Sequence, residues 1–255
     1  MDIKGVQTVV VALLVVMTAV GMAVAQEGLV ARTDPCGLIH VMRGEAEVAR
    51  IELSGHGPGW QHAGQKTAVA EVTELPDGAL RFAGRLPVPS TSEGASLSFT
   101  QTVSELPQGL RIVYDIGVNG PMQLAGLQAS VHLPVALYAG KEAIVSQPYA
   151  EPTILALPVE PSAAGAHQLW NGDGARVESA AGTADAVSIQ LRAPTNVVIQ
   201  DLRQWEQPVY EVRLPAIMQD PGRQMTADDH FHLDLVVAFA EPVELRAPQG
   251  PPAQR

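Results

Sequence analysis

The strongest constraint on the fold of this chain is the alternation of apolar and polar side chains along short segments. In residues 95–103, Ala95, Leu97, Phe99, Gln101 and Val103 take every second position, and serines and threonines fill the others. Residues 111–118 and 127–133 alternate in the same way. Successive side chains of a β-strand point to opposite faces, so this period of two predicts antiparallel strands that each bury one face. Helical periodicity is nearly absent after residue 25, and we therefore predict an all-β protein.

Turn sequences separate the alternating segments. Pro76-Asp77-Gly78, Leu106-Pro107-Gln108-Gly109 and Asn119-Gly120-Pro121 combine residues that fix φ near −65° with residues that tolerate a positive φ. Further strands are predicted at residues 38–41, 47–53, 68–73, 79–86, 187–192, 196–202, 209–214 and 230–239. About a dozen strands at this spacing predict a large antiparallel β-sandwich of two stacked sheets.

Two stretches rich in proline and glycine, residues 88–94 and 151–174, are predicted to be loops. No internal repeat is present, so we expect a single β-sandwich domain over residues 26–246. The proline-rich part of the second loop could instead divide two smaller sandwiches. Residues 247–255 are polar and proline-rich, which is typical of a disordered tail.

The first 25 residues have the pattern of an export signal. Residues 9–24 are almost wholly apolar, follow Lys4, and end in the small residues of Ala23-Val24-Ala25. We expect cleavage after Ala25 and a secreted or periplasmic protein. The alternative is an uncleaved anchor, which would attach the protein to a membrane. Cys36 does not lie in a lipobox sequence, which disfavours a lipid anchor.

The net charge limits the partners that the protein can bind, and the single cysteine excludes an internal disulfide as a source of stability. The formal net charge is −11, and removing residues 1–25 deletes one acid, Asp2, and one base, Lys4, which leaves it unchanged. Phosphate backbones would repel such a chain, so nucleic acid is not expected as a partner. Cys36 has no cysteine partner for an internal disulfide, so the core must supply the stability, and we expect Cys36 to be buried.

Three residues near the end of a predicted strand are candidates for binding carbohydrate. Alternation would place Asp201, Arg203 and Trp205 on one face. A carboxylate and a guanidinium can hydrogen-bond sugar hydroxyls, and an indole offers a flat apolar surface. The alternative is a surface ion pair with Trp205 closing an edge of the core.

The other two tryptophans, Trp60 and Trp170, lie in glycine-rich sequences that also contain His56, His62 and His167. Such segments are suitable for binding loops, and we include both tryptophans in the candidate carbohydrate site. They are equally consistent with ordinary turns that a tryptophan anchors.

A metal site is an alternative at one strand. Asp228, His230, His232 and Asp234 would share a face, and two imidazoles two residues apart can reach one metal ion. A solvated strand face explains the same pattern. We expect no metal and no cofactor, because the sequence has no zinc pattern, EF-hand, phosphate loop, dinucleotide fingerprint or nucleophile elbow.

Two regions of the chain resemble a known group of folds. They are residues 109–116 followed by 124–134, and residues 197–205 followed by 210–214 and 232–239. Their succession of long antiparallel strands is similar to the galactose-mutarotase-like supersandwich, found in secreted bacterial polysaccharide-processing enzymes. The resemblance implies this fold and a carbohydrate setting. In mutarotases a histidine and a glutamate act as general acid and base, but no such pair aligns with the pattern here.

Three functions fit these observations. The first is an exported, non-catalytic β-sandwich that binds carbohydrate or a cell-envelope partner. The second is a sugar-active enzyme, such as an epimerase, lyase or hydrolase, which requires a pocket where histidine and carboxylate side chains converge. The third is a structural protein of the cell envelope. We prefer the non-catalytic protein, because the sequence contains no complete catalytic motif.

Overall fold

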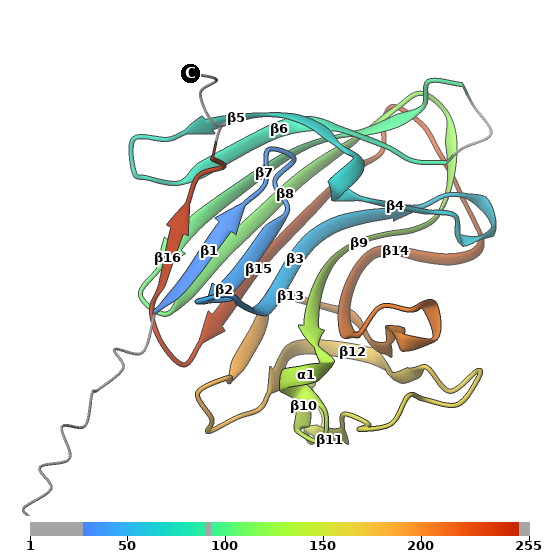
Figure 1. Cartoon of the computed structure of the whole chain (residues 1–255). Helices are drawn as coiled ribbons and strands as arrows, with labels where there is room; N and C mark the ends of the chain where they lie inside the picture. Colours follow the sequence, from blue (N-terminus) through green and yellow to red (C-terminus); the bar gives the residue numbers. More distant parts are fainter. Residues whose placement is uncertain (1–27, 90–92, 250–255) are drawn as a thin grey trace, which may run out of the picture.

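The computed structural model describes residues 28–89 and 93–249 of the chain. The predicted export signal lies outside these residues, as do the last six residues of the predicted tail. Within the described part, no helix is long and apolar enough to cross a membrane. The structure there is dominated by strands, which confirms the all-β prediction (Figure 1).

The strands follow one another with short connections. Their bounds are β1 Leu29–Thr33, β2 Ile39–Arg43, β3 Ala46–His56, β4 His62–Gly64, β5 Val69–Glu74, β6 Leu80–Pro87, β7 Ser96–Leu106, β8 Gly109–Asn119, β9 Met122–Pro134, β10 Glu142–Ser146, β11 Thr153–Ala156, β12 Gln168–Ser179, β13 Val187–Asp201, β14 Val209–Met225, β15 His230–Phe239 and β16 Val243–Arg246. The short helical elements are η1 Pro58–Trp60, η2 Gln65–Thr67, α1 Val135–Tyr138 and η3 Leu202–Trp205.

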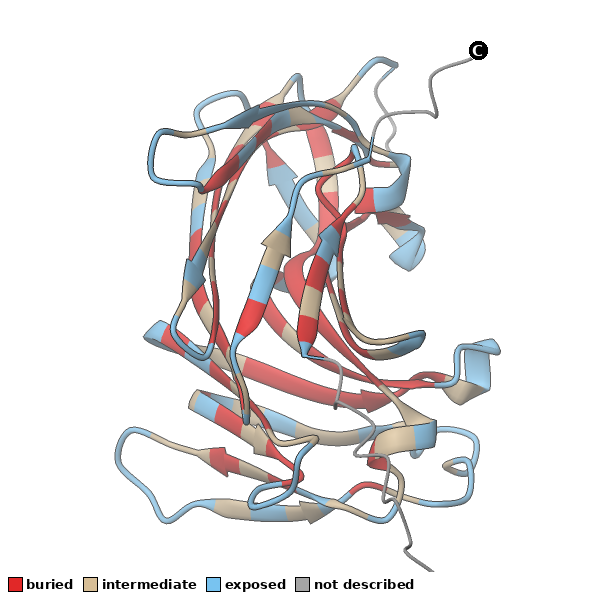
Figure 2. Ribbon diagram, turned by 60° about the vertical axis from the view of Figure 1, so that its left-hand side comes forward, coloured by how far each residue is buried: buried red, intermediate tan, exposed pale blue. Residues whose placement is uncertain are grey.

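One continuous hydrogen-bonded path joins most of these strands, in the order β16-β1-β2-β3-β9-β14-β13-β15-β8-β7-β6-β5. The long strand β13 belongs to both halves, because residues 198–201 pair with β14 and residues 187–191 pair with β15. The sheet therefore curls over itself, and its two halves form the layers of the predicted sandwich. Apolar side chains of both layers, such as Ile51 of β3 and Ile112 of β8, belong to one core (Figure 2).

A buried polar network also connects the layers. The Gln65 side chain of η2 donates to the Gln101 side-chain oxygen at 2.6 Å and accepts from the Leu53 amide at 2.7 Å. Gln101 in turn donates to the Tyr114 hydroxyl at 3.1 Å. Gln101 thus occupies the apolar side of β7, as the alternation predicted, because its buried polar atoms find partners there. Cys36 is buried, as expected, and its carbonyl accepts from Gln65.

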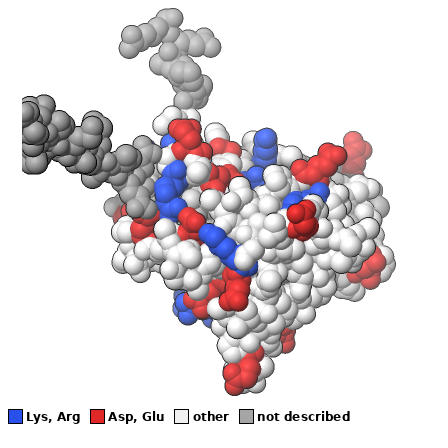
Figure 3. Space-filling model, turned by 60° about the horizontal axis from the view of Figure 1, so that its bottom comes forward, with Lys and Arg blue, Asp and Glu red and all other residues white. Residues whose placement is uncertain are grey.

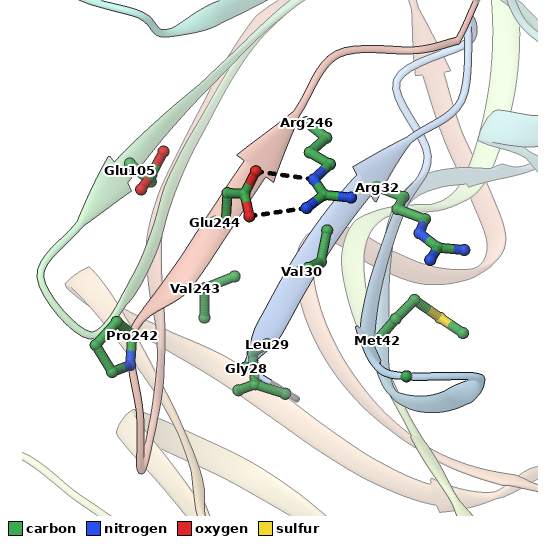
Figure 4. Close-up of a pocket in the computed structure, with 11 residues that line it drawn as sticks. Gly28, Leu29, Val30, Arg32, Met42, Glu105, Pro242, Val243, Glu244 and Arg246 are labelled. Atoms are coloured by element: carbon green, nitrogen blue, oxygen red, sulfur yellow. Dashed lines mark hydrogen bonds and ion pairs between the residues drawn. The ribbon is translucent and has the colours of Figure 1, made fainter. Parts of the chain in front are cut away.

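The edge of the sheet departs from the antiparallel pattern. β1 pairs with β16 in parallel, and a shallow pocket lies where these strands meet β2 (Figure 4). The ion pair drawn in this pocket joins Glu244 and Arg246, whose side chains are exposed.

The predicted loop at residues 151–174 is wrong in part, because it contains β11 and the beginning of β12. Gly172 and Gly174 of β12 are typical of turns, but here they let neighbouring side chains pack close to the strand. A Cβ on Gly172 would lie 3.0 Å from the Trp170 ring, and one on Gly174 would lie 2.9 Å from the Val197 side chain. The two strands predicted at residues 187–192 and 196–202 are the single strand β13.

Candidate functional site

A cleft of about 520 Å³ opens on the face of β3, β9 and β14 that is turned away from the core. In Figure 1 the three strands run side by side toward the right of the molecule, where the β4 segment and the orange η3 segment lie on either side. The volume suits a small ligand. The lining residues are Glu52, His56, Trp60, His62, His132, His167, Gln168, Gln200, Leu202, Trp205, Gln207, Glu211, Arg213 and Met218.

Strand register assembles the floor of the cleft. Arg50 of β3 lies opposite His132 of β9, which lies opposite Glu211 of β14, which lies opposite Gln200 of β13. On the next row of the same face, Glu52, Ser130 and Arg213 are opposite one another. Because the rows are two residues apart, all these side chains leave the sheet on one side, while Ile51, Val131 and Val212 enter the core.

His132 stands at the centre of this floor and is 4% exposed. Its Nδ1 lies 2.6 Å from an Arg50 guanidinium nitrogen. Its Nε2 lies 3.5 Å from Glu52 Oε1 and 3.9 Å from Glu211 Oε1. Burial lowers the pKa of His132 to about 4, so the imidazole is neutral at pH 7 and these carboxylate contacts are not ion pairs.

The two carboxylates beside His132 have different surroundings. Glu211 accepts hydrogen bonds from Ser130 Oγ at 2.6 Å and from Arg213 at 2.8 Å. Burial alone would raise the pKa of Glu211, but the charge of Arg213 and the hydrogen bonds from Arg213 and Ser130 together lower it. Burial raises the pKa of Glu52, and the charge of Glu211 adds to this effect against the opposing charge of Arg50. The pKa of Glu211 is therefore lowered and that of Glu52 is raised, although the two carboxyl groups share one floor.

One wall of the cleft comes from η1 and β4. Gly59 and Trp60 both have a positive φ, of 66° and 60°, which is uncommon for a residue other than glycine. This turn brings the indole over β9, where a Cβ on Gly126 would lie 3.2 Å from the Trp60 ring. The His56 ring lies 5.5 Å from the Trp60 ring and 5.2 Å from the His62 ring.

The opposite wall comes from η3 and the segment before β12. The His167 ring meets the Trp205 ring edge-on, with centroids 4.9 Å apart. Trp205 is 52% exposed, so its indole remains available to a ligand. Among the described residues, His167 Nδ1 and Arg213 Nε are buried polar atoms without a hydrogen-bond partner. The cleft thus combines two tryptophans with unsatisfied polar groups, as a small polar ligand with an apolar face requires.

Of the five predicted carbohydrate-binding residues, the structure places Trp60 and Trp205 in this cleft. Trp170 lies on β12, partly buried against the core, and does not line the cleft. The predicted alternation of Asp201, Arg203 and Trp205 is wrong, because β13 ends at Asp201 and the chain continues as the turn η3.

Asp201 and Arg203 have a structural task instead. They form an ion pair with a separation of 2.7 Å and side chains that are 1% and 11% exposed. Arg203 also donates to the carbonyls of Pro158, Val159 and Glu160. Asp201 accepts from the backbone and side chain of Ser162. These bonds fasten residues 158–162 to the turn that carries Trp205.

The four residues of the metal alternative do not form a common site. Asp234 accepts from Arg111 at 2.7 Å and lies 3.4 Å from Arg192. His232 bonds to Asp115 at 2.7 Å. Asp228 lies in the turn before β15, which begins at His230. Within residues 28–89 and 93–249, no group of three or more histidine, cysteine, aspartate or glutamate side chains could hold a metal ion.

Sequence reasoning missed the floor of the cleft, namely Glu52, His132 and Glu211. A signal was present, because polar residues recur at every second position in Arg50-x-Glu52-x-Ser54-x-His56, Gln128-x-Ser130-x-His132 and Glu211-x-Arg213. Alternation alone cannot distinguish a solvated strand face from the floor of a cleft. Four of the seven histidines of the chain line this cleft, which no spacing in the sequence reveals.

Other surfaces offer less chemistry. The pocket of Figure 4 has a volume of about 550 Å³, and its lining lacks histidine. On the face shown in Figure 3, acidic and basic side chains are interspersed and wide areas carry neither. The cleft beside β14 is therefore the candidate functional site.

Comparison with known proteins gives the fold a name. A galactose mutarotase related enzyme from Lactobacillus acidophilus matches 85% of this chain and 96% of its own, with 8% identity and a TM-score of 0.50. The Slr1438 protein from Synechocystis sp. PCC 6803 matches 82% of this chain and 90% of its own, with 9% identity and a TM-score of 0.51. The chain has the galactose-mutarotase-like fold.

A galactose mutarotase-like protein from Lactobacillus casei ATCC 334 also matches, with 12% identity and a TM-score of 0.48 over 78% of this chain and 89% of its own. No protein-family model and no curated protein matches the sequence. The fold confirms the resemblance expected from the strand order. One fold hosts many chemistries, so the function of this chain has to be argued from its cleft.

Proposed function

We propose that this protein binds a monosaccharide in the cleft and interconverts its anomers, as an aldose 1-epimerase. The observation that carries the proposal is the convergence of Glu52 and Glu211 on His132 Nε2, at 3.5 and 3.9 Å. Opening a pyranose ring requires one group that takes the proton of the anomeric hydroxyl and another that gives a proton to the ring oxygen. The floor of the cleft offers both kinds of group at one point.

The rest of the cleft supports a sugar as the ligand. Trp60 and Trp205 offer flat surfaces for the C–H face of a pyranose, and the glutamines and histidines offer donors and acceptors for its hydroxyls. The fold agrees with this proposal, since a relative from Lactobacillus acidophilus is described as a galactose mutarotase related enzyme. The convergence of Glu52 and Glu211 on His132 could not be seen in the sequence. Because of it, we prefer the sugar-active enzyme to the non-catalytic binding protein.

Polarimetry tests the proposal. Freshly dissolved α-D-glucose and α-D-galactose change their optical rotation slowly in buffer, and we expect the purified protein to accelerate this change. Trp205→Ala should raise KM at least tenfold, equivalent to about 1.4 kcal/mol of binding free energy. Trp170→Ala is the matched control, because Trp170 lies outside the cleft, and it should retain the KM of the unmodified protein.

The other outcomes separate the alternatives. Sugar binding measured by calorimetry without any acceleration would support the non-catalytic binding protein and contradict the enzyme. If neither sugar binds nor reacts, the proposed function is wrong. Equal effects of the two tryptophan substitutions in folded proteins would contradict the placement of the sugar at Trp205.

Export remains a proposal that rests on residues 1–25 and lies outside the described residues. Expression of the full chain in a bacterium and sequencing of the mature N-terminus would test it. We expect the mature chain to begin at Gln26 in the periplasmic or secreted fraction. An intact N-terminus in the membrane fraction would support the anchor instead.

A further inference from the structure

The face of the sheet that forms the floor of the cleft continues beyond β14. Gln200 of β13 lines the cleft, and it lies opposite both Glu211 of β14 and Gln168 of β12. The next residue of β13 on the same face is Val198, which lies opposite Asn171 of β12. Since side chains two residues apart in a strand share a face, Asn171 projects from the sheet on the same side as the cleft.

Polar side chains follow one another along this part of β12 and β13. Asn196 of β13 lies opposite Asp173 of β12, one row farther from the cleft than Asn171. Asn171 and Asp173 are exposed, and the Asn171 side-chain oxygen accepts a hydrogen bond from Asn196 Nδ2 at 2.9 Å. Asn196 Oδ1 is a buried polar atom without a partner among the described residues, so the protein alone does not satisfy this amide.

A second hollow, of about 470 Å³, lies at the far end of these rows. It is lined by residues of the β10–β11 connection and of the β12–β13 pair, namely Gln147, Pro148, Tyr149, Ala150, Asp173 and Pro194. Tyr149 is fully exposed, so its ring adds nothing to the packing of the protein. A free aromatic ring beside a carboxylate offers a flat apolar surface and a hydrogen-bond acceptor, which match the C–H face and the hydroxyls of a pyranose.

The charge of this hollow limits the ligands that it can take. Among the described residues that line it, Asp173 alone carries a charge. The nearest arginine on β12 is Arg176, whose guanidinium donates to Ser188 and to Glu178. A carboxylate without a free cation beside it accepts hydroxyl groups and repels anions. The hollow therefore suits neutral sugar units better than uronic acids or sugar phosphates.

The length of the surface exceeds one sugar unit. Gln200 in the cleft and Asn196 beside Asp173 are four residues apart on β13, which corresponds to about 13 Å in an extended strand. A single pyranose is too short to reach from the cleft to the second hollow, whereas a short chain of sugar units can reach both.

We propose that the substrate is a neutral oligosaccharide, with its reducing-end unit in the cleft and the following units bound along Asn171 and Asp173 as far as Tyr149. This inference rests on the proposed function, because anomerisation requires a free C1 hydroxyl, which only the reducing-end unit has. The surface on β12 then determines which sugars the cleft receives, and the floor of the cleft acts on their last unit.

Exchange between the α and β anomers of the reducing end, measured by NMR at equilibrium, tests this proposal. The probes are glucose, the maltose series up to maltotetraose, and the cellobiose series up to cellotetraose. In one of the two series we expect KM to fall about tenfold from glucose to the tetrasaccharide, equivalent to about 1.4 kcal/mol of binding free energy. The added units would stack on Tyr149 and donate hydrogen bonds to Asp173.

Two substitutions on the β12 surface locate the bound units. Tyr149→Ala and Asn171→Ala should each reduce the dependence of KM on chain length and keep the KM for glucose, because both residues lie outside the cleft. Val69→Ala is the matched control, since Val69 is 80% exposed on β5 at the opposite end of the sheet, and it should keep the full dependence. Thermal unfolding checks that each variant is folded.

The outcomes separate this inference from the proposed function. If glucose is anomerised and KM is the same for every chain length in both series, the oligosaccharide is ruled out and the proposed function stands. A dependence on chain length that persists in both Tyr149→Ala and Asn171→Ala would contradict the placement of the units on β12. Tighter binding of tetragalacturonate than of both neutral tetrasaccharides would contradict the neutral class.

If no sugar is anomerised, the proposed function fails, and calorimetry then decides whether the binding surface exists. Binding of a neutral tetrasaccharide that Tyr149→Ala weakens about tenfold would support the surface without catalysis. No binding of either tetrasaccharide would overturn this inference as well.

Discussion

At the scale of single residues, the cleft depends on close approaches that leave no room for additional atoms. Gly126 of β9 lies opposite His56, and a Cβ at this position would come within 3.0 Å of His56 Nδ1, 3.1 Å of Gln128 Oε1 and 3.2 Å of the Trp60 ring. The missing side chain thus lets the indole lie close to the strand. A glycine in a strand often marks such an approach.

We expect Gly126→Ala to displace the Trp60 ring and to weaken sugar binding several-fold, with a smaller effect on folding. Titration of galactose by tryptophan fluorescence measures the affinity. Gly28→Ala is the control, because nothing lies within 4 Å of a Cβ there. An unchanged affinity in Gly126→Ala would show that Trp60 does not contact the sugar.

At the scale of elements, β3, β9 and residues 209–217 of β14 are largely buried on both faces. One face packs into the core, and the other forms the floor of the cleft beneath η1 and η3. The position of η3 depends on residues 158–162, which the Asp201 and Arg203 pair fastens to it. The Asp201 backbone amide also donates a hydrogen bond to the His167 carbonyl at 2.8 Å. This bond connects the segment that carries His167 to the turn that carries Trp205.

Arg203→Lys should destabilise the protein and weaken sugar binding together, because an ammonium cannot reach Asp201 and three carbonyl groups at once. Losing hydrogen bonds between a charged group and buried acceptors should cost about 2 kcal/mol in free energy of unfolding. Urea unfolding measures this change. Arg246→Lys is the matched control, since its pair with Glu244 is exposed (Figure 4), and it should leave the stability nearly unchanged.

Equal stability of the two variants would contradict the structural role of Arg203. A loss of stability without a loss of sugar affinity would show that the Trp205 wall is held by other contacts.

At the scale of the whole molecule, folding buries histidines as neutral groups. Burial lowers the pKa of His56 and of His132 to about 4. The unfolded chain therefore binds more protons than the folded one between about pH 4 and 6.5. The stability that these groups provide is complete above pH 6.5 and is lost as the pH falls toward 4. His40 acts in the opposite direction, because its hydrogen bond to Glu47 raises its pKa.

The free energy of unfolding should rise between pH 4 and pH 7, and His56→Gln should make this rise smaller by about 3 kcal/mol. This is the contribution of a histidine whose pKa is lowered from 6.5 to about 4 on folding. Urea unfolding at several pH values measures the slope. In the original protein, the stabilisation by His40 is lost as the pH rises through its raised pKa, above pH 6.5. His40→Gln should therefore remove this loss of stability at higher pH. Parallel pH curves for the original protein and His56→Gln would contradict a buried neutral His56.

Local sequence patterns are sufficient to predict the fold class and much of the strand pattern. Alternation over residues 230–239 matches β15 at both ends, and the turn at Pro107-Gln108 separates β7 from β8. These features depend on local chemistry, because a strand needs only a period of two and a turn needs only residues with suitable φ. Residues 168–174 were mistaken for a loop because their glycines accommodate neighbouring side chains, which are not local information.

Contacts between distant segments determine which polar residues form the site. Arg50 and His132 are 82 residues apart in the sequence, and strand pairing alone brings them together. The same pairing selects Glu211 from many acidic residues and places it beside His132. Asp201 and Arg203 had suitable chemistry, but the end of β13 turned them toward the backbone of residues 158–162. A site of this kind depends on sheet register and on how the sheet curls, and both are set by contacts between distant segments.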